Sequence, residues 1–479
     1  MSRHASHHAA EATVVASAAE VRLRADRTAI TGAWLEGDDP GDRLFVNIGD
    51  LTLESGEVLP HVKIAYQTWG VLNAERSNAI LVNHALTGWS DVPSWWPEMV
   101  GPGKPFDTDK YFVVCPNVIG GCQGSTGPAS IHPDGRFYGS RFPAVTIRDM
   151  VQAEVAFSDA LGIARYVIAV GPSMGGMRAL EWAIAYPERV AGICTIGSSS
   201  VATGDQIGTW SVEIQAIKKD PHFYGGDYYD KDFSPTVGMG IARRIAHLTY
   251  RCESEMDVRF GRDLQDDNSG RWAVESYLDH QADKLQHRFD ANTYIRLTNA
   301  MASHDIGRGR GGVERALATA TLPIVVVTID TDRLFPPRLQ QEIAELAPTA
   351  EPPLVVASPF GAALQGTRDQ ARRMSALGHN VWLIRWITFV YAGFWGGVSG
   401  LLFVYYHKYI HPASLSLTNS AEAMLSVIAG GAGTLAGPAI GAAIILLLKN
   451  YVSAYVERWT MLLGFVFVAI VVFMPDGLV

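Results

Sequence analysis

The chain has 479 residues, of which 39 are lysine or arginine and 48 are aspartate or glutamate, so its formal net charge is −9. This acidic balance excludes the basic surface of a nucleic-acid-binding protein, and the length suffices for two or three domains with separate cores. The charge is unevenly placed, because residues 386–479 carry only six charged side chains: Lys408, Glu422, Lys449, Glu457, Arg458 and Asp476. A mildly acidic, soluble part therefore precedes a nearly neutral, apolar part.

The first 30 residues are rich in alanine and contain no apolar core long enough for a signal peptide. Three histidines there could bind a metal ion, but the composition favours a disordered tail: His4, His7 and His8. We expect no metal site and a reducing cytosol, because no CxxC pair occurs among the four cysteines: Cys115, Cys122, Cys194 and Cys252.

Short β-branched runs alternate with helical patterns from Leu59 onward. Each run ends in Gly, Ser, Asn or Asp: "NAILVNHALTG", "KYFVVCPNVIGG", "ARYVIAVGPSMGG", "VAGICTIGSSS" and "LPIVVVTIDTD". Continuous apolar runs that lead through turn residues into helices predict a parallel sheet covered on both faces. In such sheets the chemistry gathers at the carboxyl ends of the strands.

The third run leads into "GPSMGG", which fits the pattern G-x-S-x-G. The apolar "YVIAV" precedes it and the helix-forming "MRALEWAIAYPERV" follows it. A nucleophile elbow needs small residues on both sides of the serine, because the strand-to-helix turn is tight and strained. We therefore predict that Ser173 is a nucleophile; a structural turn serine is the alternative.

A nucleophilic serine also needs donors for the oxyanion and an acid to orient its base. The first run ends in "NHALTG", so the backbone N–H of Leu86 is expected to join that of Met174 in an oxyanion hole; an ordinary turn is the alternative. The run "VVVTIDTDRLFPP" places two acids where a triad acid belongs, and by position either Asp330 or Asp332 would serve.

A long helix-rich insertion, about residues 202–318, separates the last two runs. An insertion at this place in such a sheet is typical of a lid over the active site. At its centre, "GIARRIAHLTYRCESEMDVRFG" contains Arg243 and Arg244 with no acidic residue four positions ahead. One of them could face the substrate, or both could be solvated.

Together these segments resemble the homoserine O-acetyltransferase family, which has an α/β-hydrolase fold. The resemblance covers about residues 40–350 and rests on "HALTGWSD", "FDTDKYFVVCPNVIGGCQGSTGPASIHPDGRFYGSRFP", "TIRDMV", "GPSMGGMRALEWA", "GGDYYD", "ARRIAHLTYR", "SHDIGRGRGG" and "DTDRLFPP". It implies transfer of an acetyl group from acetyl-CoA, a co-substrate and not a bound cofactor, to the hydroxyl of L-homoserine in methionine biosynthesis. A homodimer through this domain is a further expectation.

By this resemblance Ser173 would become acetylated, Asp332 rather than Asp330 would orient the base, and Arg243 and Tyr250 would contact homoserine. One departure is Pro172, where family members usually have glycine.

The family's general base is missing. Relatives carry a histidine and an aspartate in a segment similar to "SPYGHDAFL", and here the matching residues are Ala362 and Ala363 in "SPFGAAL". His379 in "LGHNVWL" is a substitute only if the preceding helix folds back over the pocket, and His304 lies in the wrong order for a triad. We therefore expect an enzyme with an incomplete triad, whose turnover is reduced by about 10⁴–10⁶.

The apolar part predicts about three transmembrane helices, at residues 386–406, 423–448 and 459–475. Four arginines precede the first span and place residues 358–385 in the cytosol by the positive-inside rule: Arg368, Arg372, Arg373 and Arg385. The hydrolase domain is then cytoplasmic and the tail lies in the cytoplasmic membrane.

This tail, about residues 353–479, is similar to the carboxyl-terminal third of a branched-chain amino-acid ABC transporter permease. The similarity rests on "SPFGAALQGTRDQARRMSALGHNVWL", "HPASLSL", "SAEAMLSVIAGGAGTLAGPAIGA" and "RWTMLLGFVFVAIVVFMPDGL". It implies a cytosolic coupling segment over residues 358–385 that docks on a separate ATPase subunit. The motif "SPFG" is then a seam between a hydrolase domain over residues 31–357 and a permease fragment over residues 386–479.

Three hypotheses follow from the sequence: a membrane-tethered acetyltransferase with a damaged triad, a membrane component of a branched-chain amino-acid ABC transporter with permease partners, and a non-functional chimera.

Overall fold

The structure is a computed structural model that describes residues 30–265 and 269–356, together with residues 381–383, 385, 386, 389 and 442. The chain divides into two compact units, residues 1–362 and 363–479. Of the second unit, only helical positions between 381 and 389 and at 442 are described. Among all described residues, no helix has the length and apolar character needed to cross a membrane. The predicted spans and the coupling segment lie almost wholly outside the described residues.

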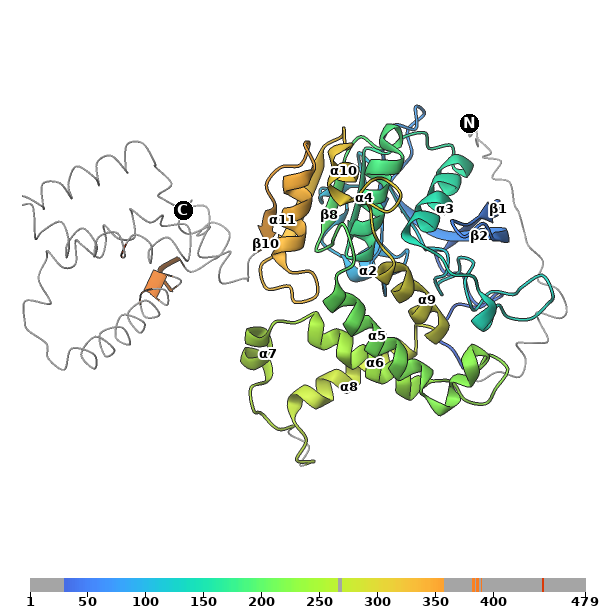
Figure 1. Ribbon diagram of the computed structural model, residues 1–479, viewed down its shortest axis with the longest axis vertical. Coiled ribbons are helices and arrows are strands. Elements are labelled where there is room, and N and C mark those ends of the chain that lie inside the picture. Colours follow the sequence, from blue (N-terminus) through green and yellow to red (C-terminus); the bar gives the residue numbers. More distant parts are fainter. Residues whose placement is uncertain are drawn as a thin grey trace, which may run out of the picture. The chain divides into compact units, whose positions relative to one another are not determined.

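Eight strands form one sheet in the order β1-β2-β6-β3-β7-β8-β9-β10 (Figure 1). The pairs β1–β2 and β2–β6 are antiparallel, and all the other neighbours are parallel. The strands of this sheet are β1 (Leu44–Thr52), β2 (Val58–Trp69), β3 (Ala79–Val82), β6 (Phe112–Pro116), β7 (Ile168–Pro172), β8 (Ile193–Ile196), β9 (Ile324–Ile329) and β10 (Leu354–Val356). A separate parallel pair consists of β4 (Val100–Gly101) and β5 (Phe106–Asp107).

Between residues 30 and 356, the described chain forms ten α-helices and three short 3₁₀ helices. The α-helices are α2 (Val92–Trp95), α3 (Ile147–Ala160), α4 (Met174–Ala185), α5 (Gly204–Lys218), α6 (Thr236–Thr249), α7 (Glu253–Phe260), α8 (Ala273–Gln286), α9 (Ala291–Ala302), α10 (Val313–Ala318) and α11 (Pro337–Leu346). The 3₁₀ helices are η1 (Gly139–Arg141), η2 (Pro187–Arg189) and η3 (Pro221–Gly226).

The central strands are buried on both faces, as their continuous apolar runs predict. In β3, Ala79 and Leu81 belong to one hydrophobic cluster, whereas Ile80 and Val82 belong to another on the opposite face. Because side chains alternate along a strand, this division requires a cover on each side of the sheet. The prediction of an α/β fold with a largely parallel sheet is thus confirmed.

The helices α5 to α9 all lie between β8 and β9 in the chain. Figure 1 shows α5, α6, α7 and α8 together, below the sheet and its helices α3, α4 and α11. The central stretch of this insertion forms two helices, since α6 ends at Thr249 and α7 begins at Glu253. The insertion is helix-rich, as the sequence predicts.

Candidate active site

Ser173 lies at the turn between β7 and α4, with φ 54° and ψ −121°. A positive φ is costly for a residue with a side chain, and persists only where the surroundings enforce it. Here the N–H of Ser173 donates to the carbonyl of Ile196 at 2.9 Å, and its own carbonyl accepts from the Oγ of Ser198 at 2.9 Å. The strained turn is thus tied to β8 and the loop after it. In the described part of the chain, Ser173 Oγ has no hydrogen-bond partner.

The glycines around Ser173 leave no room for a Cβ atom. A Cβ at Gly171 would lie 2.6 Å from the carbonyl oxygen of Asn83, and one at Gly176 would lie 2.5 Å from Oγ1 of Thr195. Gly175 is tighter still, at 2.0 Å from the same Asn83 oxygen. The glycines of "GPSMGG" are therefore needed so that β3 and β8 can approach the turn.

The two backbone donors predicted for the oxyanion hole are both on buried residues, Leu86 at 5% exposure and Met174 at 0%. Leu86 follows β3, and Met174 begins α4. Among the described residues neither N–H donates a hydrogen bond, so each remains available to an incoming oxygen. A helix N-terminus such as that of α4 also favours developing negative charge.

Of the two acids after β9, only Asp332 is held in place. Its Oδ1 accepts the N–H groups of Leu334 at 2.9 Å and Phe335 at 2.8 Å, whereas Asp330 is exposed. The Oδ2 atom lies beside Gly197, which directly follows β8, and accepts no hydrogen bond from a described residue. Burial raises the pKa of Asp332, and the two N–H donors oppose that rise. Asp332 thus offers one free oxygen to a donor in the site.

No described histidine is placed to deprotonate Ser173. His304 is buried and bonds through Nε2 to the carbonyl of Ser199 at 3.2 Å, and burial lowers its pKa to about 4. His84 uses Nδ1 on the carbonyl of Ala85 and accepts the N–H of Val118 at Nε2. Ala362, Ala363 and His379 lie outside the described residues.

The two adjacent arginines of α6 have different surroundings. Arg244 pairs with Asp279 on α8. Arg243 is 8% exposed, and its Nη1 lies 3.5 Å from Oγ1 of Thr87, the residue after Leu86. Its guanidinium carbon is 5.7 Å from the ring centroid of Tyr250. Of the two, Arg243 is the one that turns inward, towards the loop after β3, and its contact with a substrate stays a prediction.

Two further charged residues near Arg243 were missed in the sequence. Glu213 on α5 is 2% exposed and accepts the hydroxyl of Tyr294 at 2.8 Å. Burial raises its pKa to about 7, while Arg243 opposes the rise. Arg288, between α8 and α9, donates from Nη1 to the carbonyl of Thr87 at 2.7 Å. A signal for Glu213 existed, because it lies on the same helix stripe as the buried Trp210, Ile214 and Ile217.

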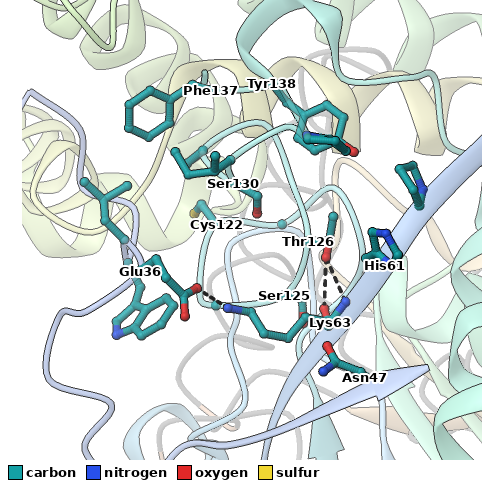
Figure 2. A pocket seen from close by; sticks show the side chains of 18 residues that line it. Glu36, Asn47, His61, Lys63, Cys122, Ser125, Thr126, Ser130, Phe137 and Tyr138 are labelled. Carbon is teal, nitrogen blue, oxygen red and sulfur yellow. Dashed lines mark hydrogen bonds and ion pairs between the residues drawn. The ribbon is translucent and has the colours of Figure 1, made fainter. Parts of the chain in front are cut away.

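A cavity of about 370 Å³ lies elsewhere, and none of the 18 residues lining it is a predicted site residue (Figure 2). Lys63 and Glu36 form an ion pair in its wall, and Oγ1 of Thr126 accepts the N–H of Lys63 at 2.9 Å. The thiol of Cys122 also lines it, but burial raises the pKa of this thiol to about 12. The described residues contain no cluster of side chains that could hold a metal ion.

Two family models match the chain. Residues 78–360 match the alpha/beta hydrolase fold, and residues 353–473 match the permease component of a branched-chain amino acid transport system. The two matches overlap at residues 353–360, which contain the start of "SPFG".

Several curated relatives match the N-terminal part of the chain. Homoserine O-acetyltransferase of Thermobifida fusca is 53% identical over 347 residues, which is 69% of this chain and 92% of the relative. The enzyme of the same name from Nocardia farcinica is 53% identical over 332 residues, covering 66% of this chain and 87% of the relative.

Solved structures agree with this match. Homoserine O-acetyltransferase from Bacillus anthracis superposes with a TM-score of 0.61 at 27% identity, covering 66% of this chain and 91% of that one. An acetylester hydrolase from Corynebacterium glutamicum gives a TM-score of 0.58 at 27% identity, covering 67% and 89%.

Proposed function

Because the chain belongs to the homoserine O-acetyltransferase family and also carries a branched-chain amino-acid permease segment, we propose that its first part transfers an acetyl group from acetyl-CoA to L-homoserine with low turnover. The observation that carries this proposal is the strained turn at Ser173, whose Oγ bonds to no described atom. The backbone N–H groups of Leu86 and Met174 likewise donate to no described atom. The product, O-acetyl-L-homoserine, would then enter methionine biosynthesis.

In the first half-reaction, Ser173 Oγ attacks the carbonyl carbon of acetyl-CoA, and the N–H groups of Leu86 and Met174 stabilise the oxyanion. Collapse of the tetrahedral intermediate breaks the carbon–sulfur bond and releases coenzyme A as its thiol. In the second half-reaction the hydroxyl of homoserine attacks the acetyl-serine ester, and Ser173 recovers its proton. Arg243 and Tyr250 would hold the acceptor.

The weak step is the removal of the Ser173 proton. Asp332 would normally orient a histidine through its free Oδ2, but the family's position for that histidine is Ala362. Without a base the proton must pass to water, so the loss in turnover should be of order 10⁴–10⁶. Binding and the oxyanion hole would supply the residual rate.

The second candidate function concerns residues 353–473, whose family match is the permease component. In this alternative the segment anchors the chain in the cytoplasmic membrane and docks on an ABC ATPase and other permease subunits, while the hydrolase domain stays cytoplasmic. The domain limits would be 1–30 for the tail, 31–357 for the hydrolase, 358–385 for the coupling segment and 386–479 for the membrane part. A non-functional chimera is the third reading, and a homodimer through the hydrolase domain remains part of the first.

The decisive experiment measures homoserine-dependent release of coenzyme A from acetyl-CoA by the detergent-solubilised chain. Ser173→Ala is the control, and the mass of the intact chain reports acetylated Ser173. Turnover that the control abolishes supports the enzyme. No turnover and no acetyl-serine, with the hydrolase domain folded, would reject it. Co-purification of an ABC ATPase with the wild type, lost when residues 358–385 are deleted, would support the transport alternative.

A further inference from the structure

Two arginines converge on Thr87, next to the Leu86 donor. Arg243 reaches it from α6, with Nη1 3.5 Å from Oγ1 of Thr87. Arg288 reaches it from the loop between α8 and α9, with Nη1 2.7 Å from the Thr87 carbonyl, and its guanidinium carbon lies 4.8 Å from the ring centroid of Trp89. Two separate segments of the insertion therefore place cations at one residue of the loop after β3.

Neither of these guanidinium groups is neutralised. In the part of the chain that the structure describes, Arg243 and Arg288 have no carboxylate within 4 Å, whereas the buried Arg178 pairs with Glu154 and Arg310 pairs with Glu181. The Nε atoms of Arg243 and Arg288 are buried and donate to no described atom. A buried charged donor without an acceptor costs several kcal/mol, so these two donors indicate an anion that completes the site.

The surrounding charges do not compensate for the pair. Burial and the positive charge of Arg243 lower the pKa of Arg288 to about 10. Burial and Arg243 also lower the pKa of His247 to about 3, so this histidine is neutral. Glu213, an acid whose charge interacts with Arg243, accepts the hydroxyl of Tyr294 through a carboxylate oxygen, and burial raises its pKa to about 7. The space between the two arginines is therefore cationic at neutral pH.

We propose that Arg288 joins Arg243, the expected homoserine contact, in binding the carboxylate of the acyl acceptor, and that Arg288 is a specificity-determining residue that selects hydroxy acids over neutral alcohols. A carboxylate has two oxygens with about four acceptor positions, enough for both Nε donors. An acceptor bound at Thr87 lies beside the N–H of Leu86. The loop after β3 therefore lies next to both the carboxylate of the acceptor and the oxyanion. This proposal rests on the proposed function for the identity of the acceptor, but binding can be tested without turnover.

The experiment is isothermal titration calorimetry of the full detergent-solubilised chain with three ligands: L-homoserine, L-homoserine amide and 4-hydroxybutyrate. The variants are Arg288→Met, Arg288→Lys and the matched control Arg244→Met, which removes a neighbouring arginine that is already paired with Asp279.

We expect Arg288→Met to weaken the binding of L-homoserine and of 4-hydroxybutyrate by at least about tenfold, the effect of losing one charge-assisted hydrogen bond. Affinity for the amide should stay weak and unchanged. Arg288→Lys should recover part of the loss, and Arg244→Met should match the wild type.

The possible results separate this proposal from the proposed function. Equal weakening of acid and amide by Arg288→Met would mean a purely structural role at Thr87 and would overturn the proposal. Three other results would also overturn the proposal. The affinity for the acids could be unchanged in Arg288→Met, or the folded wild type could bind no carboxylate. Alternatively, coenzyme A could be the one ligand whose binding depends on Arg288. If 4-hydroxybutyrate binds in an Arg288-dependent way and homoserine does not bind at all, the carboxylate site formed by Arg243 and Arg288 is supported and the homoserine function is rejected. Homoserine turnover that Arg288→Met leaves unchanged would support the homoserine function and reject the proposed role of Arg288.

Discussion

The backbone of Gly175 packs directly on the carbonyl oxygen of Asn83, so closely that a Cβ atom on Gly175 would lie 2.0 Å from that oxygen. Gly175 is in the first turn of α4, two residues after Ser173, and Asn83 follows β3, three residues before Leu86. This contact sets the spacing between the elements that carry Ser173 and Met174 on one side and Leu86 on the other. The relative placement of the nucleophile and both oxyanion donors therefore depends on the absence of one side chain.

Gly175→Ala should consequently destabilise the hydrolase domain. A methyl group forced against backbone typically costs about 1–3 kcal/mol, since the carbonyl cannot rotate away as a side chain would. Chemical denaturation of the full chain in detergent measures the effect. The matched control is Gly208→Ala on α5, where a new Cβ meets nothing within 4 Å, and where alanine should stabilise the helix by up to about 1 kcal/mol. Equal effects at the two positions would contradict the packing argument.

Arg178→Met should be among the most damaging single changes away from Ser173. Arg178 is fully buried, pairs with Glu154 and donates to the carbonyl of His84 at 2.6 Å. Its removal leaves the buried Glu154 carboxylate with the indole N–H of Trp182, at 2.8 Å, as its one remaining partner among the described side chains. Breaking such a pair costs about 3–5 kcal/mol.

Denaturation curves compare this variant with Arg136→Met, which removes an exposed partner of Asp134 and should change stability by less than about 1 kcal/mol. Adding Glu154→Gln to Arg178→Met should recover part of the loss, because the uncompensated charge disappears. A double variant no more stable than the single one would assign the loss to packing alone.

Glu213 should make stability depend on pH. Burial raises its pKa from the ordinary value of 4.5 to about 7, so the folded state favours the protonated acid. The stabilisation is fully present below pH 4.5 and is lost as the pH rises through 7. The size of the loss is at most about 3 kcal/mol.

Glu213→Gln keeps an acceptor for Tyr294 and cannot ionise. We expect the difference in unfolding free energy between this variant and the wild type to shift in favour of the variant between pH 5 and pH 8. Urea denaturation at both pH values measures it, with the exposed Glu345→Gln as control. A difference that stays constant with pH would show that Glu213 does not titrate in this range.

The sequence predicted those features that depend on local pattern. Apolar runs gave the strands of the sheet, and "GPSMGG" placed Ser173 at a turn between strand and helix, because a tight turn needs small residues. Position alone could not separate Asp330 from Asp332, since both follow β9; the difference is that the N–H groups of Leu334 and Phe335 point back at Asp332.

Features that depend on tertiary contacts could not be read from the sequence. Arg243 and Arg244 are adjacent on one helix, and only the position of Asp279 on α8 decides which of them is already paired. Arg288 comes from a loop, where no periodicity indicates the direction of a side chain. Its proximity to Arg243 arises because α6 and α8 pack together.

Restoring the family's histidine is the sharpest test of the proposed low turnover. If the segment after β10 follows the family pattern, Ala362→His places an imidazole where Asp332 Oδ2 is free to orient it. General base catalysis contributes about 10²–10⁴, so homoserine-dependent release of coenzyme A should rise by at least about a hundredfold. Ala363→His is the matched control, because it adds the same imidazole one position after the family's histidine and should not rescue. Ser173→Ala and Asp332→Asn, each combined with Ala362→His, should abolish or strongly reduce the gain. Ala362→His could also leave the rate unchanged while homoserine still binds. That result would mean that the segment after the seam at "SPFG" does not bring residue 362 to the nucleophile, so the low turnover would come from the join and not from the loss of one side chain.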